Sequence, residues 1–221
     1  CMSSAVVGYK RSLGADAPPC SYEDLELSDC VMIVGSNMAY AHPVLFRRLE
    51  EAKSHRPQMK VIVIDPRRTD TCDLADLHLA ILPGTDVALF NTLFTYIADQ
   101  GWVDADFIAK STFQGDVAVA ADSAYPASLG SFEAARVACK MSLADGAAAT
   151  GLSEAQIIQA AEWIAKRENN PTAVATAAGA AAASAAVSAL AFIRSPSGSA
   201  AGLAGSALAA DGSASALAPA A

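Results

Sequence analysis

The chain of 221 residues lacks the spacings with which cysteine and histidine usually hold a metal. Its five cysteines are scattered, none forms a CxxC pair, no cysteine and histidine lie at zinc spacing, and HExxH is absent. We therefore do not expect a structural zinc site or an iron–sulfur cluster made by this chain alone. An odd number of irregularly spaced cysteines is typical of a reducing compartment.

Basic residues are also scarce, because 15 Lys and Arg are outnumbered by 23 Asp and Glu, giving a net charge of −8. A general nucleic-acid binder needs a basic stripe that neutralises phosphates, so this class is excluded. One phosphorylated cofactor remains compatible, because backbone N–H groups at a helix start bind phosphate locally. The sequence starts with Cys1 and has no secretion signal pattern, so we interpret it as a fragment or a processed piece.

Residues 171–221 are nearly devoid of charged and large polar side chains. Alanine makes up 23 of these 51 residues, and Arg194 and Asp211 are the only charges. Three interpretations are open: a flexible Ala/Gly/Ser tail, a weak membrane span over 173–193, or an α/β segment whose side chains have been trimmed to alanine. We favour the third and expect no membrane insertion.

The remainder of the chain contains short apolar runs that end in turn residues. The runs at 30–34 and 60–64 are rich in β-branched residues, and a third run at 77–82 stops at a Pro-Gly pair. Such runs are typical of buried parallel strands. With helices between them, they predict an α/β fold with a doubly wound, mostly parallel sheet flanked by helices.

Three helices are predicted from apolar periodicity, at 42–55, after residue 85, and at 152–168. Their end signals are Pro43 in the first turn of the first helix, Thr85 or Asp86 as N-cap and Gly101 as stop of the second, and Ser153 as N-cap of the third. We predict a first unit at 1–112, a helical connection at 113–170, and the start of the next α/β subdomain at 171–221.

Ligand-type residues follow the first strand. Gly35 allows a ligand to approach the backbone, Ser36 offers a hydroxyl, and Asn37 offers both a donor and an acceptor. His42 lies shortly after this corner and is a further candidate contact. The alternative is a plain strand-to-helix turn with Asn37 in a left-handed conformation, because the full GxGxxG fingerprint is absent.

The next two strand ends carry acidic turns. Asp65 ends the second strand, where a carboxylate can hold the hydroxyls of a ribose, and Arg67 and Arg68 could reach phosphates. The alternative is a solvated turn with a surface ion pair. After the third strand, Asp86 could accept two parallel N–H bonds from a guanine edge or serve only as an N-cap. Three such ends together predict a nucleotide-bearing ligand.

Four sequence blocks resemble the molybdopterin oxidoreductase superfamily of the dimethyl-sulfoxide-reductase type. They fall within residues 1–108, in the order and spacing of bacterial nitrate reductase catalytic subunits, and are most similar to the assimilatory, cytoplasmic branch. The blocks are "CMSSAVVGYKRSLG", "VGSNMAYAHPVLFRRLEEAK", "VIVIDPRRTDTCDLADLHLAILPGTDVAL" and "GWVDADFI".

The resemblance implies nitrate reduction to nitrite by oxygen-atom transfer at a molybdenum bis(molybdopterin guanine dinucleotide) cofactor. It makes Cys1 the protein ligand of the metal, as a soft thiolate. Met2 favours nitrate, because formate-converting relatives have His at this place. The implied cofactor contacts are Val34, Gly35, Ser36, Asn37, Met38 and His42 along one dinucleotide, and Asp65, Pro66, Arg67, Arg68, Thr69, Gly84, Thr85 and Asp86 at its nucleotide end.

The resemblance also implies a [4Fe–4S] cluster in an N-terminal segment that the present sequence does not include, and an electron-donor protein or subunit. A formate dehydrogenase or another member of the superfamily, and an inactive nucleotide-binding fragment, are the alternatives. One departure is clear: where the family has a strand followed by a Met-Gly-x-Asn-Gln element, this chain reads "ATAAGAAAA" with only Gly179 kept. That departure is why we favour trimmed side chains.

Overall fold

The sheet is parallel throughout and contains four strands in the order β3-β2-β1-β4. A computed structural model of the protein describes residue 6 and residues 21–112, 132–166 and 172–176. The strands are β1 (Cys30–Val34), β2 (Lys60–Ile64), β3 (Leu77–Leu79) and β4 (Thr172–Thr176). The central strand β1 pairs with β2 along its whole length on one side and with β4 on the other. The predicted α/β fold with a parallel sheet is confirmed.

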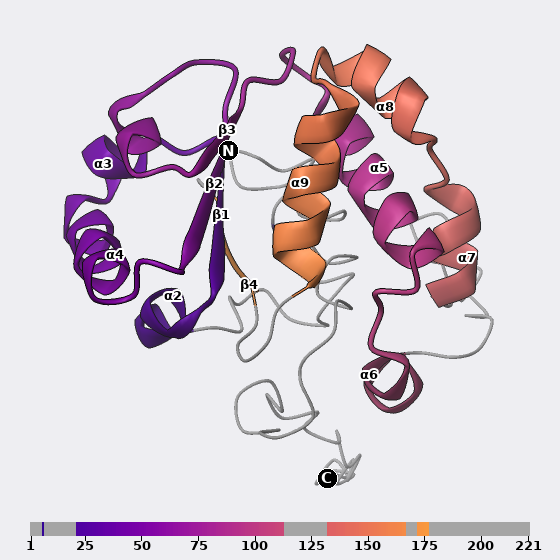
Figure 1. The fold of residues 1–221 in the computed structure, drawn as a ribbon, viewed down its shortest axis with the longest axis horizontal. Helices are drawn as coiled ribbons and strands as arrows, with labels where there is room; N and C mark the ends of the chain where they lie inside the picture. Colours follow the sequence, from indigo (N-terminus) through magenta and orange to yellow (C-terminus); the bar gives the residue numbers. More distant parts are fainter. Residues whose placement is uncertain (1–5, 7–20, 113–131, 167–171, 177–221) are drawn as a thin grey trace, which may run out of the picture.

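Strand β1 is buried on both faces, since all five of its side chains are fully inaccessible. Its alternate residues enter two different cores. Val31 and Ile33 pack with α4 (Pro43–His55), whereas Cys30, Met32 and Val34 pack with α5 (Asp86–Asp99) and α9 (Glu154–Ala165). Figure 1 shows α4 on one side of the sheet and α5 and α9 on the other. Uninterrupted apolar strands are expected when both faces of a sheet are covered.

The third strand is shorter than predicted, ending at Leu79 rather than at residue 82. Beyond Leu79 the backbone groups bond elsewhere: Ile81 N donates to Leu79 O at 3.0 Å, and Leu82 N donates to Thr150 O at 2.9 Å. The N–H groups of Ile81 and Leu82 therefore do not donate to a neighbouring strand, and the apolar run continues as a turn. The residues 80–82 therefore link the sheet edge to the end of α8 (Leu143–Thr150).

The three predicted helices are present, with end signals that work in different ways. Pro43 lies in the first turn of α4, and Gly101, at φ +70°, follows the end of α5. Ser153 caps α9 by accepting from Gln156 N. Elements without a prediction of their own are α2 (Tyr22–Leu27), α3 (Met38–Ala41), the 3-10 helix η1 (Asp70–Asp73), α6 (Ala105–Ser111), α7 (Phe132–Ala138) and α8.

The described part of the Ala-rich segment belongs to the sheet, because β4 pairs with β1. Residues 177–221, which include most of the candidate membrane span, lie outside the described residues. No helix in the described ranges is both long and apolar enough to cross a membrane. The proposed domain limits at 112 and 170 remain predictions. Helices α8 and α9 both pack against α5.

Helix α8 approaches α5 closely through Gly146, which is buried. A Cβ atom at Gly146 would lie 1.9 Å from Thr92 Oγ1 and 2.7 Å from Thr92 Cβ. Gly146→Ala should therefore lower the free energy of unfolding by about 1–3 kcal/mol through overpacking, although alanine favours a helix. Urea unfolding measures the change.

The matched control is Ala144→Gly at an exposed position of the same helix, which reports the helix propensity alone. If Gly146→Ala were as stable as the unmodified chain or more stable, close packing between α8 and α5 would not be the reason for this glycine.

Candidate functional site

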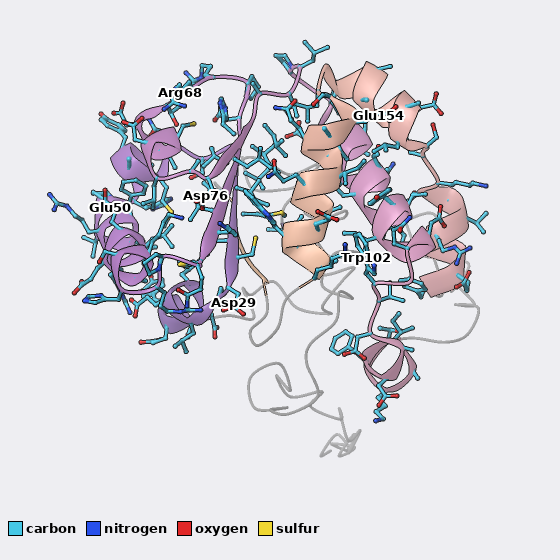
Figure 2. The ribbon with its side chains drawn as sticks, in the orientation of Figure 1. Asp29, Glu50, Arg68, Asp76, Trp102 and Glu154 are labelled. Carbon is cyan, nitrogen blue, oxygen red and sulfur yellow. The ribbon has the colours of Figure 1, made fainter. Side chains whose placement is uncertain are left out.

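The candidate site is the edge of the sheet at the carboxyl ends of the strands. Because β1, β2 and β3 are parallel neighbours, the turns that follow them share this edge. In Figure 2, Arg68, which follows β2, lies at this end of the sheet, and Asp29, which precedes β1, lies at the opposite end. The chain runs from β1 to β2 on one side, while β4 lies on the other. Such a reversal of strand order is where doubly wound sheets bind ligands.

The first corner has the positive backbone angle at its glycine and not at its asparagine. Gly35 has φ +57°, and its N–H donates to Ile64 O at 2.8 Å. Asn37 has φ −80°, so the alternative with a left-handed Asn37 is wrong. The backbone oxygen of Asn37 accepts from Tyr40 N and Ala41 N, whereas its side chain does not cap α3. The side chain of Asn37 is thus not needed to make the turn.

A buried hydroxyl that the sequence did not indicate holds this asparagine. Thr71 lies in η1 and is fully inaccessible, and its Oγ1 lies 3.0 Å from Asn37 Oδ1. Thr71 Oγ1 also accepts a hydrogen bond from Ala39 N at 3.1 Å. Thr71 therefore joins the turn after β2 to the turn after β1, across 34 residues of sequence. Only the tertiary structure brings these groups together.

The second turn places a carboxylate inside the protein. Asp65 is only 6% exposed, and its Oδ1 accepts from Arg67 N at 2.8 Å. Its backbone oxygen lies 2.9 Å from His78 Nε2, a contact that the sequence did not indicate. The side chain of Arg67 is 80% exposed, with Nε 3.9 Å from Asp65 Oδ1. The alternative of a solvated turn is therefore wrong for Asp65.

The arginines after Asp65 face solvent. Arg68 forms an exposed ion pair with Asp73 at 3.1 Å, and exposed pairs of this kind add little stability. Pro66 is exposed between Asp65 and Arg67. Both guanidinium groups therefore remain accessible to an anionic ligand at this edge.

Thr69 carries the one buried side-chain polar atom in the described residues that has no hydrogen-bond partner, its Oγ1. A buried hydroxyl without a partner is destabilising, because the desolvation of its dipole is not compensated. Its backbone oxygen is occupied, since it accepts from Cys72 N at 2.9 Å. An unsatisfied hydroxyl in the same turn as a buried carboxylate indicates a place where a polar ligand group would supply the missing hydrogen bond.

The third turn starts helix α5. Gly84 has φ +83°, and Thr85 Oγ1 donates to Leu82 O at 2.7 Å instead of capping the helix. Asp86 is the first helical residue and half-buried, so its carboxylate lies where the helix dipole favours negative charge. Thr85 therefore occupies the predicted N-cap position, but its side chain makes no cap hydrogen bond, because its hydroxyl is used by the turn.

The other predicted site residues lie in different places. Val34 and Met38 are buried beside the first corner. His42, exposed between α3 and α4, lines a pocket of about 340 Å³ together with residues of α2 and α4. Cys1 and Met2 lie outside the described residues. In the described ranges, no group of three His, Cys, Asp or Glu side chains is arranged to hold a metal ion.

Comparisons with known proteins agree on one family. The family model described as molybdopterin oxidoreductase matches residues 1–206. A nitrate reductase of Klebsiella oxytoca is 64% identical over 107 residues, which are 48% of this chain and 12% of that protein. An F420-dependent formate dehydrogenase subunit alpha of Methanocaldococcus jannaschii is 43% identical over 110 residues, 50% of this chain and 16% of that protein. The chain therefore spans less than a fifth of either relative.

A solved structure confirms the fold. Acetylene hydratase from Pelobacter acetylenicus matches with a TM-score of 0.67 at 24% sequence identity, over 87% of this chain and 24% of that protein. At this level of identity the likeness concerns the fold alone.

The two threonines Thr69 and Thr71 should respond oppositely to the same substitution. Thr69→Val removes an unpartnered buried hydroxyl and should raise the free energy of unfolding of the ligand-free chain by about 1 kcal/mol. Thr71→Val removes the partner of Ala39 N and of Asn37 Oδ1 and should lower it by about 1–3 kcal/mol. Urea unfolding of both variants, compared with the parent chain, tests the pair. Equal effects of both substitutions would contradict this account.

Proposed function

The chain belongs to the molybdopterin oxidoreductase family, and we propose that it is part of a molybdenum-dependent nitrate reductase of the assimilatory type. The Klebsiella oxytoca relative, which is named a nitrate reductase, supports the substrate. The observation that carries the proposal is the buried, unpartnered Thr69 hydroxyl, which follows β2 in the same turn as the buried Asp65, while Gly84 follows the neighbouring strand β3. This edge suits the nucleotide end of a large anionic cofactor.

The residues present fit such a cofactor. Asp65 offers a carboxylate for ribose hydroxyls, and Thr69 offers a hydroxyl that has no protein partner. Gly35, Ser36 and Asn37 form a corner at which a ligand can approach the backbone closely. Arg67 and Arg68 supply exposed positive charge for phosphate oxygens. The carboxylate of Asp65 needs a hydrogen-bond donor from the ligand, whereas the guanidinium groups of Arg67 and Arg68 need acceptor oxygens.

We propose molybdenum bis(molybdopterin guanine dinucleotide) as the cofactor, held by three stretches of this chain. When bound, the metal supplies the two-electron chemistry that moves an oxygen atom from nitrate. The chain orients it: Asp65 and Asp86 hold the guanosine part, and the corner at Asn37 holds the pterin and its phosphates. The stretches are Val34–Met38 with His42, Asp65–Thr69, and Gly84–Asp86.

Cys1 is proposed as the thiolate ligand of the metal, and Met2, which follows it in the sequence, as the residue that favours nitrate. A [4Fe–4S] cluster in a preceding segment and an electron-donor protein or subunit would supply electrons. We propose a cytoplasmic location, which agrees with the buried Cys72 remaining a thiol outside any disulfide.

Formate oxidation is the second candidate, because the Methanocaldococcus jannaschii relative is a formate dehydrogenase subunit. Met2 argues against it, since the formate branch has His after the ligand residue.

The full-length enzyme should be assayed for both reactions: nitrite formation with a reduced viologen dye, and dye reduction with formate. Metal analysis and release of guanine nucleotide on denaturation test the cofactor. An enzyme without molybdenum would overturn the proposal.

Cys1→Ser in the full-length enzyme should reduce nitrite formation by more than about 100-fold, because a hard, protonated alcohol replaces a soft thiolate. Even replacing a residue that only hydrogen-bonds to a metal ligand costs about 10–100-fold. Thermal unfolding should change little. The control is Cys139→Ser, because burial raises the pKa of the Cys139 thiol and keeps it protonated near neutral pH. Near-normal turnover of Cys1→Ser would remove Cys1 as ligand.

Asn37→Ala should weaken cofactor retention about 5–150-fold, which corresponds to about 1–3 kcal/mol for a lost buried hydrogen bond. The matched control is Tyr40→Ala, a truncation in the adjacent α3 at a residue that is 84% exposed. Molybdenum content after prolonged gel filtration measures retention. Wild-type molybdenum content in Asn37→Ala would show that the Asn37 side chain does not hold the cofactor.

A further inference from the structure

The hydrogen bonds of Thr71 to Ala39 N and Asn37 Oδ1 determine how the Asn37 side chain is oriented. We propose that Thr71 is a positioning residue that orients the Asn37 side chain so that it presents only N–H donors to the cofactor. This inference rests on the proposed function, because it deepens the role of the same corner. Thr71 itself, at 0% exposure, has no surface with which to touch a ligand.

The direction of each hydrogen bond follows from proton counting. A backbone N–H can only donate, so Thr71 Oγ1 accepts from Ala39 N, at 3.1 Å. The single hydroxyl proton of Thr71 then remains for a second bond, to the group 3.0 Å away on Asn37. A proton needs an acceptor, and the amide oxygen Oδ1 is the acceptor of that side chain. Asn37 Oδ1 is therefore turned toward Thr71.

The reverse orientation of the amide would leave a buried proton unsatisfied. If Asn37 Nδ2 faced Thr71, both groups would donate toward one another or the hydroxyl proton would need another acceptor. In the described part of the chain, Thr71 Oγ1 donates to no other group. An unsatisfied hydroxyl at a fully buried position is destabilising. The network thus selects one of the two amide orientations.

The selected orientation defines the ligand chemistry at this corner. With Oδ1 engaged, the Nδ2 amino group is the free end of Asn37, and it has no hydrogen-bond partner among the described residues. A ligand atom there must be an acceptor, such as a phosphate or carbonyl oxygen, and not an amine. Thr71 also belongs to η1, which begins directly after Thr69. One hydroxyl therefore sets the relative position of two cofactor-binding turns.

The test uses the full-length enzyme and molybdenum content after prolonged gel filtration. Thr71→Val should lower retention at least about fivefold, and Thr71→Ser should restore it, because serine keeps the hydroxyl. Thr92→Val is the control of identical chemistry: Thr92 is equally buried, and among the described residues its hydroxyl bonds only to Ala88 O of its own helix. Gly146→Ala controls for a general loss of stability away from the site.

Two variants of Asn37 separate positioning from structural support. If Thr71 acts through Asn37, Thr71→Val should add no further loss of retention in an Asn37→Ala background. Asn37→Asp keeps an acceptor for Thr71 but replaces the amino donor by an oxygen, so it should lose the cofactor at least as strongly as Asn37→Ala. Wild-type retention in Asn37→Asp would overturn the donor-only orientation.

The possible failures are distinguishable. A wild-type enzyme without molybdenum would overturn the proposed function and this inference with it. A molybdenum-containing enzyme in which Thr71→Val retains the cofactor as well as Thr92→Val, or in which Thr71→Val and Asn37→Ala are additive, would overturn only the positioning role of Thr71.

Discussion

The parallel pairing of β1 with β2 on one side and β4 on the other is the constraint on which the structure depends. It uses the hydrogen-bonding groups on both edges of β1, and helices cover both of its faces, so this strand is fully inaccessible. Because all partners run in the same direction, every turn that follows a strand emerges at one edge. The candidate site therefore consists of turns that the sheet holds at one edge, so the side chains of these turns lie near the same ligand position.

Local signals were sufficient for the elements that surround the site. The apolar runs predicted β1 and β2 with their observed limits, and Pro43 and Ser153 marked the starts of α4 and α9 because proline and serine act within one turn of themselves. The corner at Gly35 could also be anticipated, since glycine is the residue that adopts a positive φ without strain. The limit of β3 could not, because it is set by a bond from Leu82 to Thr150 in a distant helix.

The parts of the site that the sequence did not indicate are contacts between turns. Thr71 and His78 carry no motif of their own, and their importance comes from the groups they reach, Asn37 and the backbone of Asp65. The burial of Asp65 was likewise not visible in a stretch that reads as polar and arginine-rich. Sequence patterns indicate whether a residue lies on the buried or the exposed face of its own helix or strand. They do not indicate that one hydroxyl, here that of Thr71, will form hydrogen bonds to a turn far away in the sequence.

The late position of β4 in the chain has a consequence for synthesis on the ribosome. Strands β1, β2 and β3 are complete by residue 79, but the partner for the other edge of β1 arrives only at Thr172. Until then a fully apolar strand presents an open edge, which is a template for pairing with another chain. Closing so long a loop is also slow for entropic reasons. The nascent chain should therefore be most vulnerable to aggregation between these two points, and a chaperone that shields strand edges would matter most there.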